Sequence, residues 1–261
     1  MSWSRVVGRV SFINCEPIFH GLSEDWAVLA APPSWLTGHL LRKDCILAPI
    51  PAADYARNRD ELVLVPDLAI SSKGEVGSVV LFSKVGFDME SVALPSDSAT
   101  SVALLKYILQ SKGISVKYCE MGPDFEEMMK DNDACLLIGD RALEAARTHP
   151  EMVCMDLGME WRKHSNHPMV FGVFAARRDS DKELVRIAHS ALMERLSEFE
   201  SNSETRDTVI DVSIAKTGQS RERLEKYFGE VINRMDSEDL DGLNYFLKHV
   251  CKMDQPAEFC W

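Results

Sequence analysis

The sequence predicts an α/β protein that is organised as two domains. Three observations lead to this prediction: a strand–helix–strand pattern near the N-terminus, a middle block with strands and helices of its own, and a helical C-terminal part. Strand, helix and strand in succession form a βαβ unit, which is typical of proteins that layer helices on a sheet. The middle block has about 80 residues, enough for a small domain.

The N-terminal part alternates between apolar runs and one clear helix. Val, Ile and Leu dominate these runs, as in the buried strands of a mixed or parallel sheet. The predicted strands are residues 6–12, 45–50, 62–65 and 76–83. Pro33 and Ser34 are a helix-start signal ahead of three leucines, so we predict a helix over residues 34–42.

The middle block supplies a second set of elements. The predicted strands are residues 91–94, 116–119, 134–138 and 152–156. One helix is predicted directly after the polar cluster 95–101, and two more are predicted over residues 125–130 and 141–146. A strong strand is predicted over 169–176. After it the apolar spacing is helical, most clearly over 184–199 and 240–250, and we expect no further strand.

A helical tail without strands is expected to pack back on the N-terminal sheet. The first domain is therefore predicted to be discontinuous, comprising residues 1–90 and 173–261, with residues 91–172 inserted as the second domain. The two crossover segments are expected near residues 84–92 and 170–177.

Composition narrows the function. With 29 Lys and Arg against 41 Asp and Glu, the net charge is −12, which argues against binding to nucleic acid or to anionic membranes. Binding of a small anion by a few local donors remains compatible with this net charge. The seven cysteines contain no C-x-x-C pair, so neither a zinc site nor a disulfide framework is indicated. Free thiols, and the lack of a signal-peptide or membrane-spanning pattern, predict a cytoplasmic protein.

Three segments carry candidate functional residues. Asn14 follows the first strand, where open α/β sheets bind ligands, although asparagine also builds turns. In residues 96–101, one of Asp97, Ser98 or Thr100 is expected to cap the next helix, while the remaining donors form an anion site. Ser78 is a single hydroxyl in an apolar strand, which is more often structural.

Other chemistry has little support. His164 and His167 are spaced for a metal on a helix, but Pro168 makes a helix there unexpected and no further ligand completes a set. No G-x-S-x-G elbow, Walker loop or G-x-G-x-x-G is present, so we expect neither a covalent hydrolase nor a nucleotide cofactor. We therefore predict no metal and no cofactor.

Several short segments run in order along nearly the whole chain and are informative together: residues 10–14, 66–72, 76–83, 98–105, 137–140, 156–161, and 241–243 followed by Phe246. Together these segments resemble the chorismate dehydratase family, whose members catalyse the first step of the futalosine route to menaquinone. The resemblance implies a two-domain, type 2 periplasmic-binding-protein-like fold with the active site in the cleft. It also implies a lyase that dehydrates chorismate to 3-[(1-carboxyvinyl)oxy]benzoate.

Within the matched segments, Asn14 and Ser78 are the predicted catalytic residues. The predicted substrate-binding residues are Ser11, Ser98, Thr100, Ser101, Gly139 and Asp140. None of the hydroxyl or amide groups is a strong base, and Asp140 is as well placed to cap the following helix. The hypothesis is therefore that the enolpyruvyl carboxylate of the substrate accepts the proton. The competing class is a non-catalytic cytoplasmic module that binds a small carboxylate, because enzymes and binding proteins share this fold.

Overall fold

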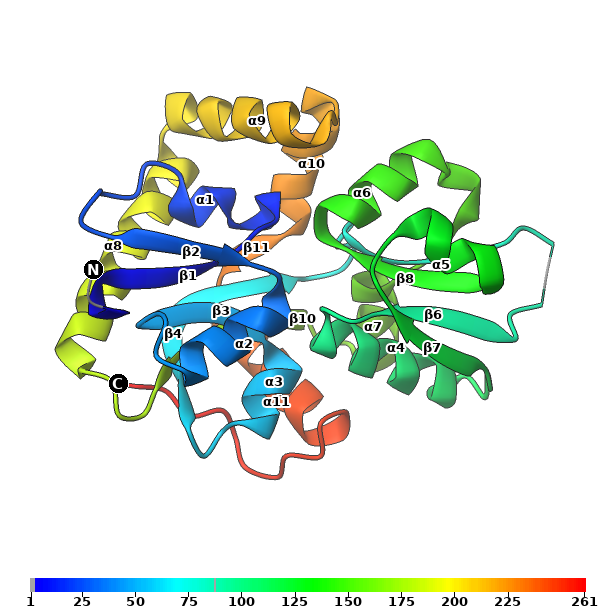
Figure 1. The fold of residues 1–261 in the computed structure, drawn as a ribbon, viewed down its shortest axis with the longest axis horizontal. Coiled ribbons are helices and arrows are strands. Elements are labelled where there is room, and N and C mark those ends of the chain that lie inside the picture. Colours follow the sequence, from blue (N-terminus) through cyan, green and yellow to red (C-terminus); the bar gives the residue numbers. More distant parts are fainter. Residues whose placement is uncertain (1–2, 87) are drawn as a thin grey trace.

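The computed structural model describes residues 3–86 and 88–261, which form two lobes (Figure 1). The first lobe is built on a six-stranded sheet in the order β11-β4-β10-β3-β1-β2. Its strands are β1 (Val6–Val10), β2 (Ala27–Ala31), β3 (Leu47–Pro51), β4 (Leu62–Ser72), β10 (Met169–Arg177) and β11 (Ile232–Arg234). The sheet is mixed: β1 is parallel to β2 and β3, whereas β10 runs antiparallel to β3 and β4.

Helices cover both faces of this sheet. In Figure 1, α1, α9 and α10 lie above it and α2, α3 and α11 lie below, and α8 packs against α1 and α9. Their bounds are α1 (Glu16–Phe19), α2 (Pro33–Leu41), α3 (Ala52–Arg57), α8 (Lys182–Ser201), α9 (Ser203–Thr217), α10 (Arg221–Glu230) and α11 (Ser237–His249).

The second lobe is built on a five-stranded sheet in the order β7-β6-β8-β5-β9. Its strands are β5 (Val79–Ser83), β6 (Ser91–Pro95), β7 (Lys117–Met121), β8 (Ala134–Ile138) and β9 (Val153–Asp156). Its helices are α4 (Ala99–Ser111), α5 (Phe125–Asp131), α6 (Gly139–Thr148) and α7 (Leu157–Ser165). Short 3-10 turns cover Trp3–Arg5 and Ile13–Cys15 in the first lobe and Pro150–Met152 in the second. The predicted α/β class is confirmed in both lobes.

The crossover segments differ from the prediction. β5 pairs antiparallel with β8 and β9 and so belongs to the second sheet, while β10 belongs wholly to the first. The chain therefore crosses before β5 and again before β10, not near residues 84–92 and 170–177. An apolar run that is buried on both faces does not specify its partner strand, which explains the error. We propose that the second lobe spans residues 73–168.

The sequence predicted a C-terminal part without strands, but this part contains one strand, β11. β11 adds three residues to the edge of the first sheet beside β4. A segment this short has no measurable period, so the surrounding helical pattern conceals it. β2 was also not predicted. It lies at the edge of the sheet and is partly exposed, and its sequence is rich in alanine rather than in Val, Ile and Leu.

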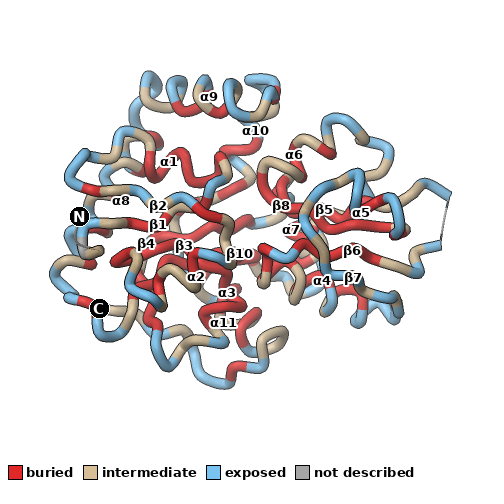
Figure 2. Tube along the Cα trace, in the orientation of Figure 1, coloured by how far each residue is buried: buried red, intermediate tan, exposed pale blue. Residues whose placement is uncertain are grey.

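The core continues from one lobe into the other. Buried residues follow the strands of both sheets, and exposed residues follow the outer loops and helix faces (Figure 2). One hydrophobic cluster joins residues such as Leu47 and Phe174 of the first lobe to Leu104 and Leu136 of the second. A smaller cluster around Phe82 and Met128 lies on the other face of the second sheet.

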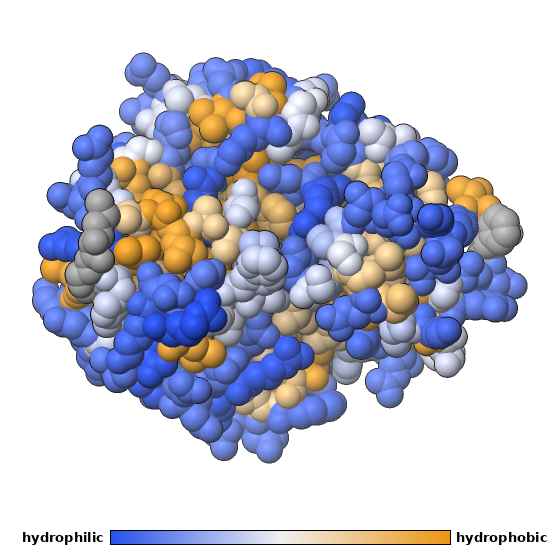
Figure 3. Space-filling model, viewed as in Figure 1, coloured by the Kyte–Doolittle hydropathy of each residue, from blue (hydrophilic) through white to orange (hydrophobic). Residues whose placement is uncertain are grey.

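The outer surface is mostly polar. Hydrophobic side chains form separate patches on the face in Figure 3 rather than one continuous area. Within residues 3–86 and 88–261, no helix is long and apolar enough to cross a membrane.

Candidate active site

A cavity lies between the lobes and is lined by residues from both. Its empty volume is about 550 Å³ when the open mouth is included. Apolar side chains form most of the wall, and five polar side chains face it. These five are Asn14, Ser78, Ser98, Thr100 and Ser101. None of the described residues that line this cavity is charged.

Asn14 faces the cavity from the 3-10 turn that follows β1. Its backbone carbonyl accepts a hydrogen bond of 3.2 Å from the side-chain amide of Asn233 in β11, which also donates to the carbonyl of Ala69 at 3.4 Å. The Asn14 side chain is only 9% exposed, and its Oδ1 has no hydrogen-bond partner among the described residues. A buried acceptor without a partner is unfavourable, so this amide is positioned for a ligand rather than for a turn alone.

Ser78 faces the cavity from the connection between β4 and β5. Asp156 holds that connection by accepting from the backbone N–H groups of Val76 at 3.2 Å and Gly77 at 2.8 Å. The Ser78 carbonyl accepts from the Gly139 N–H at 2.7 Å, and its hydroxyl oxygen accepts from Tyr227 at 3.1 Å. The 4% exposed side chain of Ser78 is therefore fixed on both its backbone and its hydroxyl.

Gly77 makes this arrangement possible. Its φ of +66° favours glycine, and a Cβ at this position would collide with the side chains of Arg223 and Glu230. These two form an ion pair of 2.9 Å on α10, directly against the connection. The second lobe is thus anchored to α10 next to Ser78.

The helix start of α4 forms a third wall. Ser98 is the N-cap residue, but its side chain makes no capping hydrogen bond, and neither Asp97 nor Thr100 takes that role. The predicted cap is therefore wrong: Ser34 of the first lobe accepts from the Ala99 N–H at 3.3 Å. Since capping comes from the other lobe, the start of α4 is completed only when the lobes are closed.

The next two N–H groups of α4 remain available. Those of Thr100 and Ser101 have no partner in the described part of the chain, and both residues line the cavity. The Thr100 hydroxyl oxygen accepts from the Ala53 N–H at 3.1 Å, which again joins the lobes. Free N–H groups at a helix N-terminus are suited to an anion.

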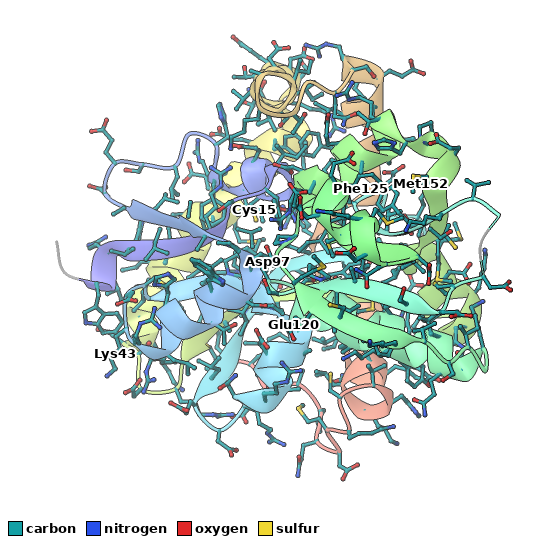
Figure 4. All side chains as sticks on the ribbon, turned by 45° about the vertical axis from the view of Figure 1, so that its right-hand side comes forward. Cys15, Lys43, Asp97, Glu120, Phe125 and Met152 are labelled. Carbon is teal, nitrogen blue, oxygen red and sulfur yellow. The ribbon has the colours of Figure 1, made fainter. Side chains whose placement is uncertain are left out.

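Asp97 and Arg141 form an ion pair of 2.5 Å beside this wall. The Arg141 guanidinium also lies 5.1 Å from the centre of the Phe12 ring, and Phe12 lines the cavity. Asp97 and Cys15 lie where the lobes meet (Figure 4). Arg141 is therefore engaged with Asp97 and Phe12 and does not line the cavity.

Two predicted substrate-binding residues lie outside the cavity. Ser11 is exposed, and its N–H donates to the Ala31 carbonyl at 3.1 Å. Asp140 does not cap α6, whose N-cap residue is Ile138; instead it accepts from the Ile13 N–H at 2.9 Å and joins the two lobes. Burial raises the pKa of its carboxyl group.

Gly139, in contrast, lines the cavity. Its φ is +61°, and a Cβ there would collide with the Phe12 ring.

The Cys15 thiol next to Asn14 is not suited to act as a nucleophile. Burial raises the pKa of this thiol to about 12, so a reactive thiolate is disfavoured.

The histidines near residue 165 pack on different aromatic rings. The helix α7 continues to Ser165, further than Pro168 had suggested, so His164 is helical. Its ring lies edge-on to Tyr107 with centres 5.4 Å apart, whereas the ring of His167 packs on Tyr245 at 4.8 Å. The two side chains therefore have separate structural roles.

Two residues that support the site were missed by sequence reasoning. Tyr227 reaches Ser78 from α10, and Asn233 reaches Asn14 from β11. Tyr227 sits in an ordinary apolar helix pattern with Leu224 and Phe228, so no local signal distinguishes it.

The architecture and the cavity between its lobes define a type 2 periplasmic-binding-protein-like protein. A protein of Archaeoglobus fulgidus has a similar structure, with a TM-score of 0.72 and 18% identity over 93% of this chain and 96% of its own. A Candida albicans protein described as having the generic periplasmic-binding-protein fold is similar at a TM-score of 0.66 and 12% identity, over 95% and 88% of the two chains.

The sequence comparisons are more specific. A family model described as menaquinone biosynthesis matches residues 6–252, and the chain belongs to this family. A chorismate dehydratase from Thermus thermophilus is 34% identical over 218 residues, which cover 76% of this chain and 80% of that protein.

Proposed function

We propose that the protein is a hydro-lyase that removes water from chorismate and forms 3-[(1-carboxyvinyl)oxy]benzoate for menaquinone synthesis. The family and the Thermus relative support the substrate. One structural observation supports this reaction: Asn14 and Ser78 face one cavity that has mostly apolar walls and, among the described residues, no charged lining residue. The non-catalytic binding module is not favoured by these comparisons.

The cavity offers positioning rather than a base. In the proposed reaction, the C3–H bond breaks and its proton passes to the enolpyruvyl carboxylate of the same molecule. The electron pair of that bond forms the new ring double bond as the C4–O bond breaks. The leaving oxygen takes up the proton and departs as water, so atoms and charge balance. Since the ring becomes aromatic, the protein mainly has to orient the substrate and assist proton transfer.

The direct test is to incubate the purified protein with chorismate and follow the aromatic product by absorbance and mass spectrometry. Formation of 3-[(1-carboxyvinyl)oxy]benzoate with release of water is the expected result. Binding of chorismate without product would support the non-catalytic module instead.

A flat pH profile is expected for kcat. No described residue lining the cavity titrates near neutrality, and burial raises the pKa of Tyr227 behind it, so the phenol stays neutral. A carboxylate of the substrate is already ionised, so kcat should vary by less than about twofold between roughly pH 6.5 and 8.5. The measurement is initial rate at saturating chorismate in overlapping buffers. A rise governed by a group with a pKa near 7 would contradict the substrate-assisted route.

One carboxylate of chorismate is expected at the start of α4. At a net charge of −12, the whole protein does not attract an anion, so local donors have to hold it. We propose that the free N–H groups and hydroxyls of Thr100 and Ser101 do so within about 2.7–3.2 Å. Because the same helix start is completed by Ser34 and Ala53, the bound anion would also favour the closed lobes.

Thr100→Val is accordingly expected to weaken chorismate binding by about one to two orders of magnitude. Calorimetric titration in a Ser78→Ala background, where turnover is slow, measures this. Ser101→Ala serves as the companion variant because its hydroxyl makes no bond to the other lobe in the described residues. Unchanged affinity in both variants would be inconsistent with an anion at this helix start.

We further propose that the protein works in the cytoplasm. Its seven cysteines are all free thiols, and three of them are buried in the core. Menaquinone-family membership is consistent with this location.

A further inference from the structure

We infer that Tyr227 is a positioning residue that makes Ser78 a hydrogen-bond donor toward the leaving oxygen of the substrate. This inference rests on the proposed function, because it assigns a role within the same reaction. Tyr227 lies on α10 of the first lobe, outside the cavity wall, and its hydroxyl contacts the Ser78 hydroxyl at 3.1 Å.

Burial fixes the direction of this hydrogen bond. Tyr227 is fully buried, and within the described residues Ser78 is the only group that accepts a hydrogen bond from its hydroxyl. If Ser78 donated to Tyr227 instead, the phenolic hydrogen would be buried without an acceptor, which is costly. The favourable arrangement is therefore that Tyr227 donates and Ser78 accepts.

The Ser78 hydrogen is then directed to the cavity. A serine hydroxyl has one hydrogen, and in the described structure no protein atom accepts it. A hydroxyl that accepts a hydrogen bond is also a stronger donor, because the two bonds polarise each other. Ser78 is thus prepared to donate to an oxygen that gains negative charge, as the C4 oxygen does when its bond to carbon breaks.

The surroundings of Tyr227 hold its ring in place. The Arg223 guanidinium lies 5.7 Å from the centre of that ring and is itself paired with Glu230 at 2.9 Å. The same ion pair packs against Gly77, the neighbour of Ser78. The donor and the acceptor of the Tyr227–Ser78 bond are therefore positioned by one set of contacts, and burial, which raises the pKa of Tyr227, keeps the donor protonated.

The test is the Tyr227→Phe variant, which removes the hydroxyl and retains the ring. We expect kcat for chorismate to fall by about tenfold, with KM changed by less than about twofold, since the polarised bond matters most in the transition state. In a Ser78→Ala background the same change should have no further effect on kcat, because the Tyr227 hydroxyl acts only through Ser78. A merely structural role would lower kcat in both backgrounds.

A matched control is Tyr55→Phe. Tyr55 lies on α3 and is also buried, but it does not line the cavity. Its hydroxyl oxygen accepts a hydrogen bond of 2.9 Å from the Glu258 N–H. This variant should keep kcat within about twofold while lowering the thermal midpoint as much as Tyr227→Phe does. Should Tyr227→Phe fold poorly, 3-fluorotyrosine at position 227 keeps the hydroxyl as a stronger donor, and kcat is expected to match or exceed the parent.

The outcomes separate the two claims. If the parent protein forms no product from chorismate, the proposed function fails and this inference fails with it. If the parent is active and Tyr227→Phe retains full kcat, or loses it equally with and without Ser78, only the inference about Tyr227 is overturned. A fall in kcat with 3-fluorotyrosine would also overturn it.

Discussion

Ser78→Ala is expected to lower kcat for chorismate dehydration by about 10²–10³-fold, the usual loss when a donor that acts in the transition state is removed from an ordered site. The hydroxyl has little freedom: its oxygen accepts from Tyr227, and the backbone on either side is fixed by Asp156 and Gly139. Alanine keeps the backbone but removes the hydroxyl, which is both the donor toward the cavity and the acceptor for Tyr227.

The thermal midpoint of Ser78→Ala should fall by an amount that corresponds to about 1–3 kcal/mol, because the buried Tyr227 hydroxyl loses the group that accepts its hydrogen bond. Steady-state kinetics with chorismate and a thermal unfolding scan measure the two effects. Ser213→Ala is a suitable control, since Ser213 is fully buried but donates to the Val209 carbonyl within α9. Retention of more than half of the parent rate by Ser78→Ala would remove Ser78 from the mechanism.

The candidate site was predictable where its residues follow local signals. Asn14 follows a strand, and residues 98–101 begin a helix, and both positions are marked by short polar segments next to apolar runs. The fold then brings these segments to one cavity together with Ser78 and Gly139. Ser11 and Asp140 belong to the same segments, but local signals do not specify on which side a side chain emerges, and both lie elsewhere.

What the sequence did not predict depends on contacts between distant segments. Tyr227 reaches Ser78 across 149 positions of the chain, and Asn233 reaches Asn14 across 219. The cap of α4 comes from Ser34 of the other lobe for the same reason. Likewise, the assignment of β5 to the second sheet depends on pairing with β8 and β9, which an apolar run alone does not encode.

Asn14→Ala is expected to have an effect on kcat as large as that of Ser78→Ala, about 10²–10³-fold. The side-chain amide is buried at the cavity wall, and its oxygen has no partner among the described residues. Asn233 fixes the backbone of Asn14, so the substitution removes the amide without releasing the turn. Because an acceptor without a partner is removed, the free energy of unfolding should stay the same or rise slightly.

Asn14→Asp separates hydrogen bonding from charge at the same position. Aspartate has nearly the same shape but adds a carboxylate to a cavity whose described lining is uncharged and whose proposed substrate carries two. Chorismate binding should therefore weaken by more than about tenfold, whereas Asn14→Ala should lower kcat with a smaller change in affinity. Titration of both variants with chorismate, alongside kcat and KM, measures the difference. If Asn14→Asp bound chorismate as tightly as the parent, neither substrate carboxylate would lie near Asn14, and the substrate would have to be placed with both carboxylates toward α4.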